Sequence, residues 1–66
     1  MIMVNGQPVD FRPDMVLADA LKETGIDTES PVLITIDGVH VDKQNIRSVK
    51  LRDDAEINVL PFLSGG

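Results

Sequence analysis

The chain has 66 residues, enough for one small domain but not for a deep catalytic pocket beside its own core. Its net charge of −5 argues against binding to nucleic acid, and no apolar run is long enough to span a membrane. Cysteine is absent, which excludes disulfides, a nucleophilic thiolate and thiolate metal ligands. Because the first residues show no signal-peptide pattern, we expect a cytoplasmic protein without membrane or nucleic-acid partners.

Two short strands joined by a tight turn are predicted first. Residues 1–4 are apolar, and Asn5-Gly6 is the strongest short hairpin signal because both residues tolerate positive φ. Residues 7–11 are the predicted return strand. Pro8 has no backbone donor, which assigns this return strand to an edge of the sheet.

A helix is predicted next, over residues 16–24. Residues 12–14 break the strand pattern, and apolar side chains then recur at helical spacing with charged side chains on the other face. Gly25 stands where a left-handed C-cap belongs. The sequence places the start of the helix only to within two residues. Asp14 is a capping residue by type, whereas Val16 lies nearer the expected boundary.

A second hairpin is predicted after the helix. A polar loop at residues 27–31 precedes residues 32–36, a continuous β-branched and apolar run typical of a central strand. Asp37-Gly38 predicts another tight turn. Residues 39–41 are the predicted return strand.

The connection to the last strand is mostly polar. Residues 42–47 contain one apolar anchor, Ile46, and residues 49–51 form either a short extra strand or an extended segment. Residues 52–54 turn the chain, because Asp favours turns. The last strand is then predicted over residues 55–60.

Period-2 alternation in the last strand places Ile57 and Val59 on one face and Asn58 and Leu60 on the other. The order β-β-α-β-β-β predicts an α+β protein in which one helix covers a mixed sheet of four to five strands. If the last strand lies beside the first, in the centre, both return strands lie at the edges. This is the β-grasp arrangement, and we expect residues 1–66 to form a single β-grasp domain.

No set of side chains predicts catalysis within the chain itself. Asp53-Asp54 is the only adjacent carboxylate pair, and a solvated turn is its better interpretation. His40, the only histidine, alternates with apolar neighbours and lacks the companions that a catalytic histidine needs. The scattered acids do not form convergent metal ligands, so we expect no metal site.

The end of the chain, residues 60–66, is the remaining candidate. Pro61 cannot donate to a strand ladder, so the strand should stop there and leave residues 62–66 as a flexible diglycine tail. The tail is either a frayed terminus or a segment made for a partner. Phe62 and Leu63 favour a partner, since exposed apolar groups imply one, and two glycines are thin enough to enter a narrow channel.

Over essentially its whole length the chain resembles the ThiS and MoaD proteins, small β-grasp sulfur carriers that are distant relatives of ubiquitin. The resemblance rests on five short stretches, on their order and spacing, and on the chain stopping at the second glycine. The stretches are Val4-Asn5-Gly6, Leu17-Ala18-Asp19-Ala20-Leu21, Ile36-Asp37-Gly38, Leu51-Arg52-Asp53-Asp54 and Gly65-Gly66.

The resemblance implies a carrier that serves partner enzymes and is not itself an enzyme. An E1-like adenylyltransferase of the ThiF or MoeB type would bind the tail and let the Gly66 carboxylate attack the α-phosphate of ATP. Mg-ATP belongs to that partner, and the chain binds no cofactor. A sulfur donor, such as a cysteine desulfurase persulfide, would displace AMP and leave a thiocarboxylate on Gly66. The acceptor would be thiazole synthase or the large subunit of molybdopterin synthase.

The resemblance also implies roles for the residues around the tail. Gly66 carries the thiocarboxylate, Gly65 gives steric access, and the three residues before Gly65 line the partner's channel. Leu60, on the outward face of the last strand, is a docking contact, whereas Ile57 and Val59 belong to the core. The implied partner-binding residues are Leu60, Phe62, Leu63, Ser64 and Gly65.

Three alternatives stay open. The run Leu60-Pro61-Phe62 looks closer to the molybdopterin carriers, whereas the short length and the first turn look closer to the thiamine carriers. The same diglycine end would also serve a ubiquitin-like modifier that is joined to lysines through Gly66. A plain binding module with an accidental tail is the third hypothesis.

Overall fold

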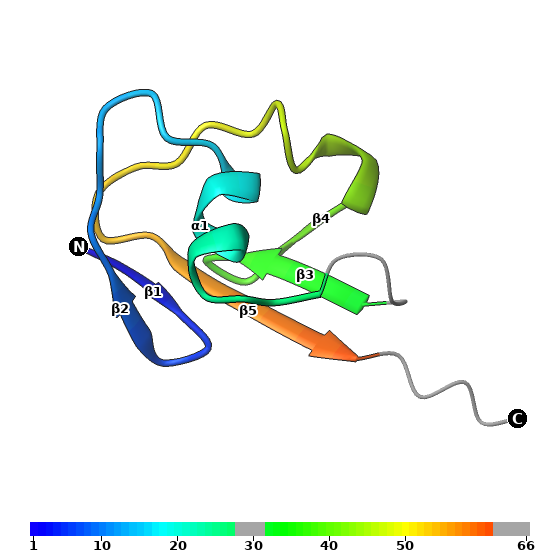
Figure 1. Ribbon diagram of the computed structural model, residues 1–66. Helices are drawn as coiled ribbons and strands as arrows, with labels where there is room; N and C mark the ends of the chain where they lie inside the picture. The colour runs from blue at the N-terminus through cyan, green and yellow to red at the C-terminus, as the bar shows by residue number, and fades with distance from the viewer. Residues whose placement is uncertain (28–31, 62–66) are drawn as a thin grey trace, which may run out of the picture.

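The computed structural model describes residues 1–27 and 32–61, which form a five-stranded sheet and one α-helix (Figure 1). The strands are β1 (Ile2–Val4), β2 (Gln7–Val9), β3 (Val32–Ile36), β4 (Val39–Val41) and β5 (Glu56–Pro61). The helix α1 spans Leu17–Glu23, and a 3₁₀ turn, η1, spans Lys43–Asn45. This confirms the predicted α+β class and order of elements. Within the described ranges, no helix is long and apolar enough to cross a membrane.

The strand order in the sheet is β2-β1-β5-β3-β4. The last strand, β5, lies in the centre, parallel to β1 and antiparallel to β3. The return strands β2 and β4 lie at the two edges, as the predicted β-grasp arrangement requires. In the parallel pair, Met3 lies opposite Glu56 and Val4 opposite Ile57. The last strand is therefore held from both sides.

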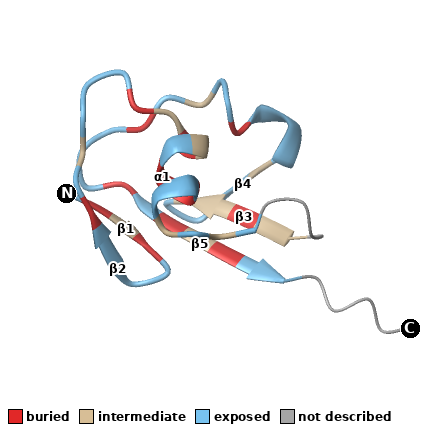
Figure 2. Ribbon diagram, in the orientation of Figure 1, coloured by how far each residue is buried: buried red, intermediate tan, exposed pale blue. Residues whose placement is uncertain are grey.

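The core lies between α1 and one face of the sheet. Ile57 and Val59 of β5 are only 0% and 7% exposed, which confirms the predicted inward face. Figure 2 shows buried positions along β1, β3 and β5 beneath the helix. Each fully buried aliphatic side chain stabilises the fold by about 1.5–3 kcal/mol relative to an exposed one. The other large, fully buried side chains are Ile2, Val4, Leu17, Leu21 and Ile34.

The helix begins after Val16, so the alternative that Asp14 is the cap is wrong. The Val16 N–H donates to the Asp19 carboxylate at 3.1 Å, and the Asp19 N–H donates to the Val16 carbonyl at 3.0 Å. Asp14 lies in the preceding turn with φ of +65°. Its side chain is not needed, because backbone carbonyls of residues 46 and 49 accept from the first two helical N–H groups.

The helix ends at Glu23, with a glycine cap behind it. Gly25 has φ of +73°, which confirms the predicted left-handed cap. The N–H groups of Gly25 and Ile26 donate to the carbonyls of Lys22 and Leu21, each at 3.1 Å. These two bonds close the last turn and reverse the chain direction.

Residues 49–51 form an extended segment and not a strand of the sheet. They run beside the residues just before the helix, where Val16 and Lys50 form an isolated bridge. The Leu51 N–H donates to the Met15 carbonyl at 2.8 Å. Residues 49–51 therefore form their backbone hydrogen bonds with the residues that precede α1, and not with a strand of the sheet.

Several strand boundaries differ from the sequence prediction, and β1 and β5 each begin one residue later than predicted, at Ile2 and Glu56. β2 stops at Val9 and not at residue 11, because its partner β1 begins at Ile2, which is the partner of Val9. The last strand runs one residue further than predicted. Pro61 pairs with Val32 and is the last residue of β5. At the end of a strand, the missing backbone N–H of proline removes little of the hydrogen bonding between strands.

Candidate functional site

The candidate site lies where the chain leaves the sheet at the end of β5. Leu60 of this site falls within the described part of the chain, and it is 57% exposed. The exposed end of β5 follows its buried centre in Figure 2. The other predicted site residues lie outside the described residues; they are Phe62, Leu63, Ser64, Gly65 and Gly66.

Leu60 points to the face of the sheet that the helix does not cover. The register places it directly opposite Leu33 of β3, and Asn58 opposite Thr35. Side chains that lie opposite one another share a face, so Leu60 and the half-buried Leu33 form an apolar pair beside the chain exit. The prediction that Leu60 faces away from the core is confirmed.

The side chain of Asn5 holds β5 just before this exit. Its Nδ2 donates to the Val59 carbonyl at 3.2 Å, and its Oδ1 accepts from the Val59 N–H at 2.8 Å. The Asn5 backbone N–H donates to the Ile57 carbonyl at 2.9 Å. A side-chain amide therefore continues the ladder between β1 and β5 after β1 has turned away. We call this contact the Asn5 clamp.

The sequence assigned Asn5 to a turn and missed this second role. The turn does require its positive φ of +49°, which Asn tolerates. The signal that could have revealed the clamp is the amide itself. It carries both a donor and an acceptor, and β1 was predicted to lie beside the last strand.

Two titratable side chains were considered as candidates: Asp53 lies in a turn, and His40 lies on the edge strand β4. Asp53 accepts a hydrogen bond from the N-terminal ammonium of Met1, which lowers the pKa of the Asp53 carboxyl. A carboxyl held in its charged form is a poor proton donor at neutral pH. His40 is exposed, with its Nδ1 atom 4.0 Å from the Asp42 carboxylate. Among the residues that the structure describes, no three His, Cys, Asp or Glu side chains converge as metal ligands.

The ThiS family model matches residues 1–66. The chain belongs to the ThiS family. Its fold is similar to the crystal structure of a thiamine biosynthesis protein, ThiS, from Geobacter metallireducens, with a TM-score of 0.77. The two chains are 19% identical, over 98% of this chain and 97% of that one. The solution structure of a thiamine biosynthesis protein from the same organism gives a TM-score of 0.69 at 19% identity, over 98% and 86%.

At this identity the two structures establish a shared fold, and no curated protein matches the chain. The family match confirms the resemblance to the ThiS and MoaD carriers. Membership of the ThiS family supports a small sulfur carrier in thiamine biosynthesis. It also implies an E1-like activating enzyme and a thiazole synthase as partner classes.

The Asn5 clamp predicts a specific effect of the Asn5→Gly substitution. Glycine accepts the positive φ of this turn without strain, so the main native-state change is the loss of the two side-chain hydrogen bonds. We expect the free energy of unfolding in urea to fall by about 1–2 kcal/mol. Hydrogen exchange at the Val59 amide should accelerate, while the Asn58 amide on the β3 side keeps its protection.

Asn5→Asp is the matched control for this experiment. It keeps an acceptor for the Val59 N–H but loses the donor to the Val59 carbonyl. The Val59 amide should therefore stay better protected than in Asn5→Gly. Equal protection of Val59 in the wild type and in Asn5→Gly would show that the clamp does not hold β5.

Proposed function

We propose that this protein carries sulfur as a thiocarboxylate on Gly66, formed by an E1-like enzyme of the ThiF type. The carboxylate oxygen of Gly66 attacks the α-phosphate of the partner's Mg-ATP and releases pyrophosphate. A donor persulfide, such as that of a cysteine desulfurase, attacks the acyl-adenylate and AMP leaves. Cleavage of the remaining sulfur–sulfur bond by a second thiol leaves the thiocarboxylate. The observation that carries this proposal is the ThiS family match, which includes both terminal glycines.

The chemistry explains why the carrier needs a partner. A carboxylate is a poor electrophile, and adenylation gives its carbonyl a good leaving group. The described residues offer a folded support and an exposed strand end, so the catalytic groups are assigned to the activating enzyme. In this proposal Gly65 gives steric access to the carbonyl. The remaining tail residues line the enzyme's channel; they are Phe62, Leu63 and Ser64.

Thiazole synthase is the proposed acceptor of the sulfur. The ThiS family match favours it over the large subunit of molybdopterin synthase. Both similar structures are named as thiamine biosynthesis proteins, which supports the same choice.

Docking is proposed to begin at Leu60. The side chain is exposed, lies opposite Leu33 and comes just before the residues that enter the enzyme. The Asn5 clamp supports this role, because it holds β5 as far as Val59 and thereby fixes the direction in which the chain leaves the sheet. An apolar side chain at this position can be buried on complex formation without any change in the fold.

The position of the terminal carboxylate can be tested by adding one alanine after Gly66. One residue moves the carboxylate by about 3.5 Å, too far for in-line attack on the α-phosphate. We expect adenylation to fall by at least about 100-fold, measured as ATP–pyrophosphate exchange with a ThiF-type enzyme. Circular dichroism should show an unchanged fold. Retained adenylation of the extended chain, shown by mass spectrometry to be untrimmed, would contradict the mechanism.

The docking role of Leu60 is tested by Leu60→Gln. Losing an apolar contact buried in the complex should lower kcat/KM for adenylation by about tenfold. The Tm should change little, because Leu60 is exposed in the free protein and loses only its contact with Leu33. Val39→Gln is the control, since Val39 is 67% exposed but lies on the edge strand β4. If both variants lower kcat/KM equally, Leu60 is not a specific contact.

A further inference from the structure

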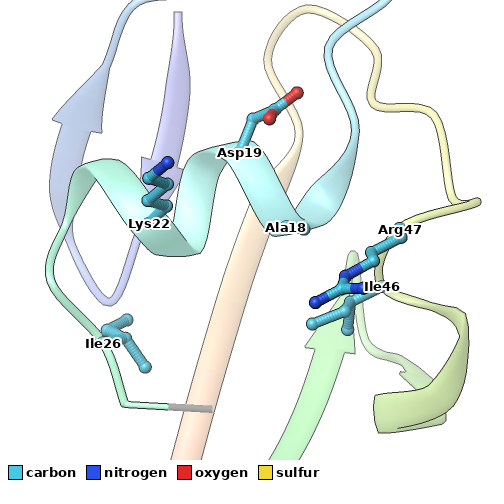
Figure 3. A pocket seen from close by; sticks show the side chains of 6 residues that line it. All are labelled: Ala18, Asp19, Lys22, Ile26, Ile46 and Arg47. Atoms are coloured by element: carbon cyan, nitrogen blue, oxygen red, sulfur yellow. The ribbon is translucent and has the colours of Figure 1, made fainter.

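A hollow beside α1 lies on the opposite side of the sheet from Leu60. It has a volume of about 380 Å³, and Figure 3 shows its lining from three segments. The buried Ile46 and the half-buried Ile26 make its apolar part, and Lys22 and Arg47 are exposed at its rim. The complete lining is Ala18, Asp19, Lys22, Ile26, Ile46 and Arg47.

The two cations at this rim differ from other basic side chains of the protein. Arg12, Lys50 and Arg52 each form an ion pair with a carboxylate. Lys22 and Arg47 form neither an ion pair nor a side-chain hydrogen bond within residues 1–27 and 32–61. In a chain of net charge −5, two cations that have no ion-pair partner in the described part of the chain thus line the same hollow.

The acid at the rim does not neutralise them. The Asp19 carboxylate accepts a hydrogen bond from the Val16 N–H at the start of the helix, at 3.1 Å. In Figure 3 it points away from Ile26 and Ile46. Asp19 keeps its negative charge, so Lys22, Arg47 and Asp19 together give the lining of the hollow a net charge of +1.

The walls of the hollow are held in place by backbone hydrogen bonds. The Ala18 N–H donates to the Ile46 carbonyl at 2.9 Å, which fixes the segment that carries Arg47 against the helix. The Ile26 N–H donates to the Leu21 carbonyl at 3.1 Å, which fixes the other side. A ligand would meet a preformed surface, so binding does not require these segments to become ordered.

We propose that this hollow binds an acidic segment of a partner protein. A carboxylate of the segment lies between Lys22 and Arg47, and a neighbouring apolar side chain covers Ile26 and Ile46. Charge complementarity selects the acidic class, because the rest of this acidic surface disfavours such a segment. The apolar part favours a peptide over a free anion, because an anion would not cover the half-buried Ile26. The inference does not rest on the sulfur-carrier mechanism, and Leu60 stays accessible when the hollow is filled.

The test is a titration of the full-length, ¹⁵N-labelled protein with the acetylated and amidated peptide Leu-Glu-Leu-Glu, followed by NMR. We expect saturable shifts at the amides of Ala18, Lys22, Ile26 and Arg47, with a Kd on the order of 1 mM at low salt. Added salt should weaken binding, because both cations are exposed. The peptide Leu-Gln-Leu-Gln has the same shape without the charges and should not bind.

Two double variants separate a specific site from general charge effects. Lys22→Gln with Arg47→Gln should raise the Kd about tenfold. Lys50→Gln with Arg52→Gln removes the same charge from paired cations outside the hollow and should leave the Kd unchanged. The proposal is overturned by no shifts up to ~10 mM peptide, by equal binding of the glutamine peptide, or by equal weakening in both variants. Tighter binding of inorganic phosphate at the same amides would also overturn it, in favour of a free-anion site.

Discussion

The parallel pairing of β1 with β5 is the constraint on which the rest of this fold depends, because it joins the first and last strands of the described chain. The pairing closes a loop that spans most of the sequence. The conformational entropy lost in closing this loop must be offset by the other contacts that β5 makes. β3 pairs with the other edge of β5, and the Asn5 clamp extends the β1 side to Val59. The chain therefore leaves the sheet from a central strand held on both sides.

This arrangement separates two kinds of surface. The face of the sheet under α1 is used for the core, whereas the uncovered face presents Leu60 and Leu33 beside the chain exit. The outer side of the helix region presents a hollow with Lys22 and Arg47 at its rim. A carrier that meets an activating enzyme and an acceptor in turn benefits from separate contact surfaces, because one can stay occupied while the other is exchanged.

Local patterns were sufficient for much of the fold. Alternation in the last strand correctly separated Ile57 from Leu60, and Gly25 marked the helix end correctly. The helix start was ambiguous because distant backbone carbonyls cap it, so the side chain of Asp14 gave a misleading signal. The clamp was missed because it joins residues 54 positions apart. The hollow depends on packing between the helix and residues 46–47, which no local pattern encodes. The role proposed for residues 62–66 depends on a partner protein.

Whether Gly66 carries sulfur is tested most directly by mass spectrometry of the C-terminal peptide of the protein, isolated from its native host during growth that demands thiamine synthesis. The expected result is replacement of one oxygen by sulfur at the terminal carboxylate of Gly66. Lysine peptides of other proteins that bear a branched Gly-Gly remnant from this chain, with no sulfur on Gly66, would contradict the carrier and indicate a modifier. An unmodified carboxylate with no conjugates would contradict both and leave a binding module.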